Sequence, residues 1–196
     1  MSNLDLIKKS QTIMKDHWLI ALLVLIVYSI ITSFPNRIDD SLNIINLFIG
    51  GAFTLGFSIY FLNVVRGTNP KFENLFDGFK KYVPSLVAFV VMIIVVTLGF
   101  ILLIVPGIML ACGLSQTFFI LADDETEMSG IDALKKSWEM MDGWKVKYFL
   151  LNLIHMGMII VGILMLVIGI FYMIPIISTS QALFYEKLKA GELTPA

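Results

Sequence analysis

The sequence predicts an all-α, polytopic membrane protein: a helical bundle of six transmembrane helices in three hairpins, each preceded by an amphipathic helix at the cytoplasmic interface. Composition is the first observation, because hydrophobic residues make up 58% of the chain and charged residues only 15%, against roughly 45–50% and about 25% in soluble domains. The second is that uncharged stretches have lengths that fit one or two crossings of a bilayer. The third is that lysine and arginine gather in alternate loops.

The first hairpin is predicted between residues 18 and 65. Trp18–Phe34 carries no charge over 17 residues, which is near the lower limit for crossing a hydrocarbon core of about 30 Å. A polar turn at Pro35–Asp40 follows it. Leu42–Val65 then supplies 24 uncharged residues, which is ample for a second span.

Two longer uncharged runs each predict a further hairpin. Tyr82–Ala122 has 41 residues without a charge, and at about 1.5 Å per residue this is roughly twice the thickness of the bilayer core. We expect it to reverse at Val105–Gly107, because Pro106 fixes φ in a turn and the following glycine permits a positive φ. Tyr148–Tyr185 has the same excess length, and its turn is expected between Gly169 and Pro175.

The distribution of positive charge predicts the orientation of these spans. With six crossings, 13 of the 14 lysine and arginine residues fall on one side and Arg37 alone falls on the other. Cytoplasmic loops are the ones that carry the excess of Lys and Arg. Both termini are therefore predicted to be cytoplasmic, and the spans must be helices because each backbone polar group in the bilayer has to be satisfied within the chain.

Short segments of the sequence recur, which predicts an internal repeat within a single membrane domain, residues 1–196. Ser115–Phe119 resembles Ser180–Phe184 at an offset of 65, and Asp5–Ser10 resembles Asp132–Ser137. A fixed offset between similar segments is typical of repeated structural units. We assign the units to residues 1–66, 67–125 and 126–190, the middle one having a shorter or shifted amphipathic part.

Amphipathic stripes with aromatic anchors precede the hairpins. Met128, Ile131, Leu134, Trp138 and Met141 lie at helical steps of three and four, and Ser129 has capping-box spacing to Asp132. Such helices would lie in the headgroup region, where aromatic side chains gather. They would serve as a lipid or partner platform, or simply as anchors that fix the depth of each hairpin. The predicted interfacial anchors are Trp18, Trp138, Trp144, Phe76 and Phe79.

Polar residues inside the predicted spans are the candidate functional positions, since polar groups are costly in a bilayer. Asn152 and His155 share one face of the fifth span. Gln116 and Gln181, preceded by Ser115 and Ser180, occupy repeat-related positions and are expected to meet across a pseudo-symmetric interface. These residues would either line a polar path between repeats, as in some transporters, or form interhelical hydrogen bonds that hold the bundle together.

Other function classes are disfavoured by the sequence. The net charge of -1 gives no basic field for nucleic acid, and no catalytic motif or paired intramembrane carboxylates are found, so no enzyme, cofactor or metal site is predicted. Cys112 is interpreted as a packing residue. The acidic run Asp123–Glu127 would attract a divalent cation, or would form a solvated loop that favours the N-terminus of the following helix.

Several motifs together resemble a known family. They are Arg66-Gly67, Leu75–Lys80, Ile104–Ile108, Ala133–Trp138 and Phe184-Tyr185. They resemble a large bacterial family of uncharacterised polytopic integral membrane proteins, which is related to the membrane domain fused to some glycerophosphoryl diester phosphodiesterases. The resemblance covers nearly the whole chain and implies a location in the bacterial cytoplasmic (inner) membrane. It supplies no activity and no catalytic residues.

Two functional hypotheses follow from the sequence. The first is a non-enzymatic membrane scaffold or accessory subunit, whose partners would be the lipid bilayer and either another membrane protein or further copies of the chain. The alternative is a small-molecule or lipid transport and handling module, with a polar site between repeat-related helices.

Overall fold

The computed structural model describes residues 1–33, 43–164 and 168–194 of the chain, and in these residues every regular element is helical. Residues 1–66, which the sequence assigns to the first unit, include α1 (Asn3–Met14), α2 (Trp18–Ser33) and α4 (Asn43–Arg66). Residues 67–125 include α5 (Asn74–Asp77), the 3-10 helix η2 (Gly78–Lys81), α6 (Tyr82–Leu102), α7 (Ile104–Gly113) and α8 (Thr117–Asp123). Residues 126–190 include α9 (Gly130–Met140), α10 (Lys145–Leu164) and α11 (Ile168–Lys189).

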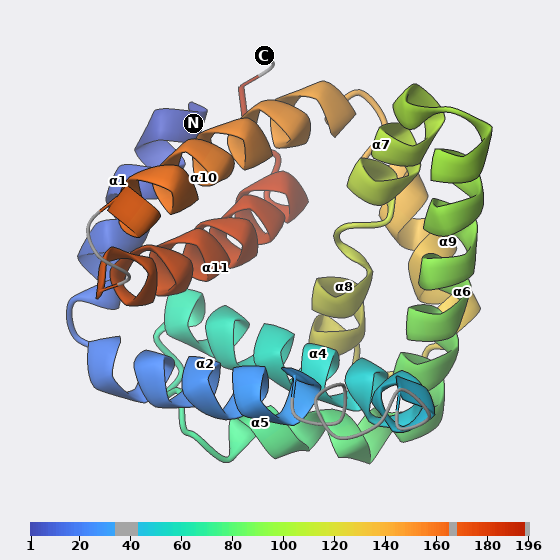
Figure 1. The fold of residues 1–196 in the computed structure, drawn as a ribbon, viewed down its shortest axis with the longest axis horizontal. Helices are drawn as coiled ribbons and strands as arrows, with labels where there is room; N and C mark the ends of the chain where they lie inside the picture. Colours follow the sequence, from blue (N-terminus) through green and yellow to red (C-terminus); the bar gives the residue numbers. More distant parts are fainter. Residues whose placement is uncertain (34–42, 165–167, 195–196) are drawn as a thin grey trace.

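The hairpins are arranged around a common centre and run in different directions. Figure 1 shows α2 and α4 along the lower edge, α6 and α7 on the right, and α10 and α11 at the upper left. Within each hairpin the second helix is the inner one. In the most apolar stretches of Leu47–Arg66 and Ile104–Asp123, 61% and 56% of the residues are buried inside the protein. In those of Asn74–Leu102 and Lys145–Leu164, the buried shares are 17% and 28%.

In each of these helix pairs, residues near the start of the first helix lie close to residues at or beyond the end of the last helix. Lys81, just before α6, donates from Nζ to the carbonyl of Leu121 at 3.0 Å and to that of Asp124, both at the end of α8. Lys147, in the first turn of α10, donates in the same way to Thr194, beyond the end of α11. In the first hairpin, Leu19 of α2 shares a groove with Lys71, which follows α4.

Each amphipathic segment packs on helices other than the helix pair that follows it in the chain. The segments α5 and η2 pack on α4, α9 packs on α6 and α8, and α1 packs along α11. The order of contacts is therefore cyclic, because the first amphipathic helix covers the last hairpin. The helix starts agree with their sequences: Ser2 and Asp5 form a capping box at α1, and the Ser129 hydroxyl accepts from the Asp132 N–H at 3.2 Å at α9.

The chain has the helices that a membrane protein requires. Among the residues that the structure describes, four helical segments are long and apolar enough to cross a bilayer, namely Leu47–Arg66, Asn74–Leu102, Ile104–Asp123 and Lys145–Leu164. A fifth is obtained if α1 and α2, which meet at a bend of 102°, are taken as one span. The predicted all-α membrane class is therefore confirmed at this level.

Two of the three expected turns are displaced from the positions that the sequence predicted, and the third, at Pro35–Asp40, lies outside the residues that the structure describes. The first reversal lies at Leu103, which is extended (φ −164°, ψ 152°), so that Pro106 falls in the first turn of α7, where its missing N–H costs nothing. The second expected turn, Gly169–Pro175, lies inside α11. Pro175 lies within this helix, and the Thr179 hydroxyl donates to the Pro175 carbonyl at 2.8 Å.

Candidate functional site

The inner helix of the second hairpin is broken at residues 114–116, and a serine from a neighbouring helix joins the two ends. The Ser137 hydroxyl of α9 donates to the carbonyl of Gly113 at 2.8 Å and accepts from the N–H of Gln116 at 3.2 Å. Ser137 is fully buried. It thus satisfies one orphan carbonyl at the end of α7 and one orphan N–H at the start of α8.

Gln116 lies in this break with its side chain fully buried. Its amide Nε2 donates to the Ser115 hydroxyl at 2.8 Å, and Ser115 in turn donates to the Cys112 carbonyl at 2.7 Å. Its Oε1 atom is buried and has no hydrogen-bond partner among the described residues. A buried acceptor without a donor is costly, so Gln116 is the position in the break that an additional donor would satisfy.

His155 and Ser180 form a second buried pair, between α10 and α11. His155 Nε2 lies 2.7 Å from the Ser180 hydroxyl, and that hydroxyl donates to the Ile177 carbonyl at 2.8 Å. Because the single hydroxyl proton of Ser180 is used in this way, the histidine donates from Nε2 and leaves Nδ1 as an acceptor. Nδ1 is buried and lacks a partner among the residues that the structure describes.

The remaining candidate residues have different surroundings. Asn152 donates from Nδ2 to the carbonyl of Tyr148 at 2.9 Å on its own helix, and the Tyr148 phenol has Ser115, Gln116 and Asn152 as polar neighbours. Gln181 is half-buried, and its side chain makes no hydrogen bond with the described residues. The expected meeting of Gln116 and Gln181 is therefore not seen as a hydrogen bond. The pairs that the structure forms are Gln116 with Ser115 and His155 with Ser180.

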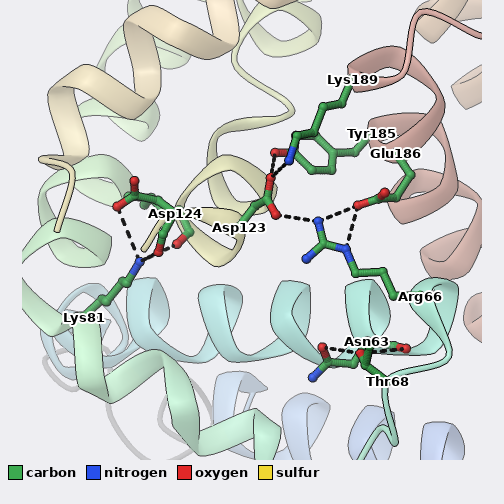
Figure 2. A network of polar contacts seen from close by, with 10 residues as sticks. Asn63, Arg66, Thr68, Lys81, Asp123, Asp124, Tyr185, Glu186 and Lys189 are labelled. Carbon is green, nitrogen blue, oxygen red and sulfur yellow. Dashed lines mark hydrogen bonds and ion pairs between the residues drawn. The ribbon is translucent and has the colours of Figure 1, made fainter. Parts of the chain in front are cut away.

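A network of ion pairs joins the inner ends of the three hairpins (Figure 2). Arg66, at the end of α4, lies 2.5 Å from Asp123 Oδ1 at the end of α8 and 2.7 Å from Glu186 Oε1 in the last turns of α11. Asp123 Oδ2 also receives the Tyr185 hydroxyl at 2.8 Å and the Lys189 ammonium at 2.5 Å. Two cations thus face two carboxylates, and the charges balance within the network.

The first two residues of the acidic run after α8, Asp123 and Asp124, are bound by protein groups, whereas Glu125 and Glu127 are exposed. Asp124 accepts from the Thr126 hydroxyl at 2.7 Å and the Met128 N–H at 2.8 Å, and lies 3.5 Å from Lys81 Nζ. Burial of Asp124 raises its pKa, but these hydrogen bonds and the charge of Lys81 lower it more, so that the pKa is about 2. Its carboxylate is therefore ionised above this pH and fixes the loop that leads to α9.

The predicted aromatic anchors lie where the hairpins and amphipathic segments meet. Trp18 packs on Tyr172 with ring centroids 5.0 Å apart, and Trp144 is partly buried against the core of the third unit. Trp138 lies under Lys145 Nζ, which is 3.7 Å from the ring centroid. Phe76 and Phe79 are exposed at their outer sides and pack edge-on against Phe53, at 5.9 and 5.1 Å.

Comparison with known families assigns the chain. A family model described as "Protein of unknown function (DUF975)" matches residues 1–112 and again residues 88–192. The chain belongs to the DUF975 family. The two overlapping matches in this DUF975 chain agree with an internal repeat, and the expected membership of an uncharacterised family is confirmed. No curated protein and no solved structure was found to match the chain.

Three features of this DUF975 protein were missed by the sequence reasoning. The break at residues 114–116 carried no proline or charge that would have revealed it. Ser137 was visible as the repeat counterpart of Ser10, but nothing in the pattern shows that its hydroxyl would reach another helix. Arg66 had a signal that could have been used, because it is the single charge at the inner end of a long apolar span and needs partners there.

Proposed function

We propose that this DUF975 protein is a non-enzymatic membrane scaffold or accessory subunit in the cytoplasmic (inner) membrane of a bacterium. The observation that carries the proposal is that two buried polar side chains, His155 and Ser137, bond directly to neighbouring helices. His155 bonds to Ser180, and Ser137 bonds across the break beside Gln116. Hydrogen bonds of this kind hold membrane helices together and fix their register.

The finer topology belongs to this proposal: six spans in three hairpins, in one domain with repeat units 1–66, 67–125 and 126–190, and with both termini in the cytoplasm. Two kinds of contact support it. Lys81 and Lys147 bond from the start of one helix pair to its end, and α4, α8 and α11 meet in one ion-pair network. Reporter fusions test it. A fusion after Arg37 should report the outer side, and fusions after Lys71, Lys135 and Lys189 should report the cytoplasm. A cytoplasmic signal after Arg37 would contradict the topology.

The partners of such a scaffold would be the bilayer and a second membrane protein or further copies of the chain. The outer helices support this, because α6 and α10 expose large apolar side chains such as Ile94, Leu98, Met156 and Ile160. An apolar surface of this kind is stable against lipid tails or against another apolar helix. The aromatic anchors at the hairpin bases would set its depth in the membrane.

The alternative function is a small-molecule or lipid transport module, and one observation favours it. A broken helix places the buried Oε1 of Gln116 in the break, and His155 Nδ1 is a second buried acceptor. Discontinuous helices form the binding sites of many transporters, because their free backbone groups face the substrate. Here the Ser137 hydroxyl already bonds the Gly113 carbonyl and the Gln116 N–H, one on each side of the break. The side-chain oxygen of Gln116 is therefore the group that a ligand would bind.

Alanine substitutions at Gln116 and Gln181 distinguish the two functions. If the buried Gln116 side chain holds the scaffold together, Gln116→Ala should lower membrane abundance and thermal stability. Any growth phenotype should then follow abundance. Gln181→Ala is the matched control, because this half-buried repeat counterpart makes no side-chain hydrogen bond with the described residues, and it should leave both quantities unchanged. Loss of the phenotype in both variants at normal abundance would contradict the scaffold and support transport.

A further inference from the structure

The three hairpins meet in cyclic order, the outer part of one against the base of the next, and the three junctions are packed differently. At the first junction α4 contacts α6 so closely that a Cβ atom on Gly51 would lie 2.5 Å from the Ser85 carbonyl oxygen. The second junction, between α7 and α10, leaves a cavity of about 270 Å³. The third, between α11 and the elbow of α1 and α2, leaves about 540 Å³. The glycine contact closes the first junction, whereas the other two remain open.

The groove at the third junction has an apolar floor with a polar rim. Leu22 and Ile176 lie in the floor, and Trp18 and Tyr172 pack together in it at 5.0 Å. The exposed end of α1 supplies Lys15, with Gln11 one turn before it. A lysine above an apolar groove with aromatic walls is the arrangement found at the headgroup level of a bilayer, where the aliphatic stem packs and the ammonium faces the phosphates.

We propose that this groove binds one anionic phospholipid, with an acyl chain along the floor and the headgroup phosphate at Lys15 and Gln11. The charge of the rim favours an anionic lipid, because Lys15 is the charged residue among those lining the groove and forms no ion pair with a residue that the structure describes. Asp16 is exposed but does not line the groove. Basic residues near the surface of the cytoplasmic leaflet attract anionic lipids.

The second junction provides an internal contrast. Its lysine, Lys145, is already engaged, because Nζ lies 3.7 Å from the Trp138 ring centroid and 3.7 Å from the Asp142 carboxylate. The rest of that cavity is apolar, with Val105, Met109 and Phe149 among its walls. It has room for an acyl chain but no free cation for a phosphate. The anionic preference is therefore assigned to the third junction.

Native mass spectrometry of the full-length protein in detergent tests the proposal, with dioleoyl phosphatidylglycerol and dioleoyl phosphatidylcholine as probes. The wild type should bind one phosphatidylglycerol about tenfold more tightly than phosphatidylcholine. Lys15→Gln should reduce phosphatidylglycerol binding to the level of phosphatidylcholine. Lys9→Gln is the control, because Lys9 is exposed on the same helix but does not line the groove, and it should keep the preference.

A second variant tests the groove itself, independently of charge. Leu22→Trp fills the floor and should remove the bound lipid of either kind, while the melting temperature without lipid shows that the variant is folded. Equal binding of the two lipids by the wild type, an equal effect of Lys9→Gln and Lys15→Gln, or a dimer in which the groove is covered would overturn the proposal. None of these results bears on the scaffold function, which depends on the outcome at Gln116 and Gln181.

Discussion

At the scale of single residues, two repeat-related serines have different roles. Ser10 and Ser137 end similar segments of the sequence and are both fully buried. The Ser10 hydroxyl donates to the Leu6 carbonyl of its own helix at 2.8 Å. The Ser137 hydroxyl instead leaves its helix and connects the end of α7 to the start of α8. One position of the repeat therefore serves as local support in one unit and as a link between units in another.

This difference predicts unequal costs for the same substitution. Ser137→Ala leaves a carbonyl and an N–H of the break buried without partners, and we expect the free energy of unfolding to fall by about 1–3 kcal/mol. Ser10→Ala leaves a helical carbonyl that keeps its backbone bond, so its cost should be below about 1 kcal/mol. Thermal unfolding of both variants in the same detergent measures the difference. Similar melting temperatures would show that Ser137 does not hold the break together.

At the scale of elements, the sequence predicted most helices and missed their interruptions. The uncharged stretch that begins at Trp18 gave α2 its correct start, and Leu42–Val65 anticipated α4 to within one residue at each end. Ser129 marked the start of α9. Length, hydrophobicity and capping are local properties, and these elements depend on them.

The turns and the site depend on contacts that no local pattern records. The sequence predicts turns at Pro106 and Pro175, but the structure holds both prolines within helices, and the first reversal lies at Leu103. The separate break in the inner helix lies at residues 114–116, which carry no turn signal. A serine from α9 makes that break stable. Of the polar candidates, the pairing of His155 with Ser180 required knowing that α10 and α11 are neighbours in register. The residues were visible in the sequence, but their partners were not.

At the scale of the whole molecule, the ion-pair network holds together the inner ends of helices from all three units. Arg66 contributes from the first, Asp123 from the second, and Glu186 and Lys189 from the third. The side chain of Asp123 is 15% exposed and that of Arg66 31% exposed, so these charges are partly shielded from water. Charge-assisted hydrogen bonds in such surroundings are stronger than those on an open surface.

Removal of the arginine should therefore loosen the molecule as a whole. Arg66→Met leaves Glu186 without its cation and Asp123 with one cation fewer, and we expect a loss of about 2 kcal/mol in the free energy of unfolding. Lys80→Met is the control, because the Lys80 side chain is 79% exposed in its pair with Asp77 and should cost at most about 0.5 kcal/mol. Chemical unfolding in detergent would compare them, and equal losses would contradict a central role for Arg66.

The cyclic packing also has a consequence for biosynthesis. The helix α1 is translated first, but the helix that it covers, α11, is translated last. The contacts of α5 with α4, and of α9 with α6 and α8, can form as soon as the later segment is made. The contact of α1 with α11 has to wait until α11 is made. Until then Leu6 of α1, which packs in one core cluster with Leu183 and Phe184 of α11, lacks these partners. A ribosome that stops before α11 would release a product with this helix uncovered, and such exposure is what quality-control proteases recognise in an incomplete membrane protein.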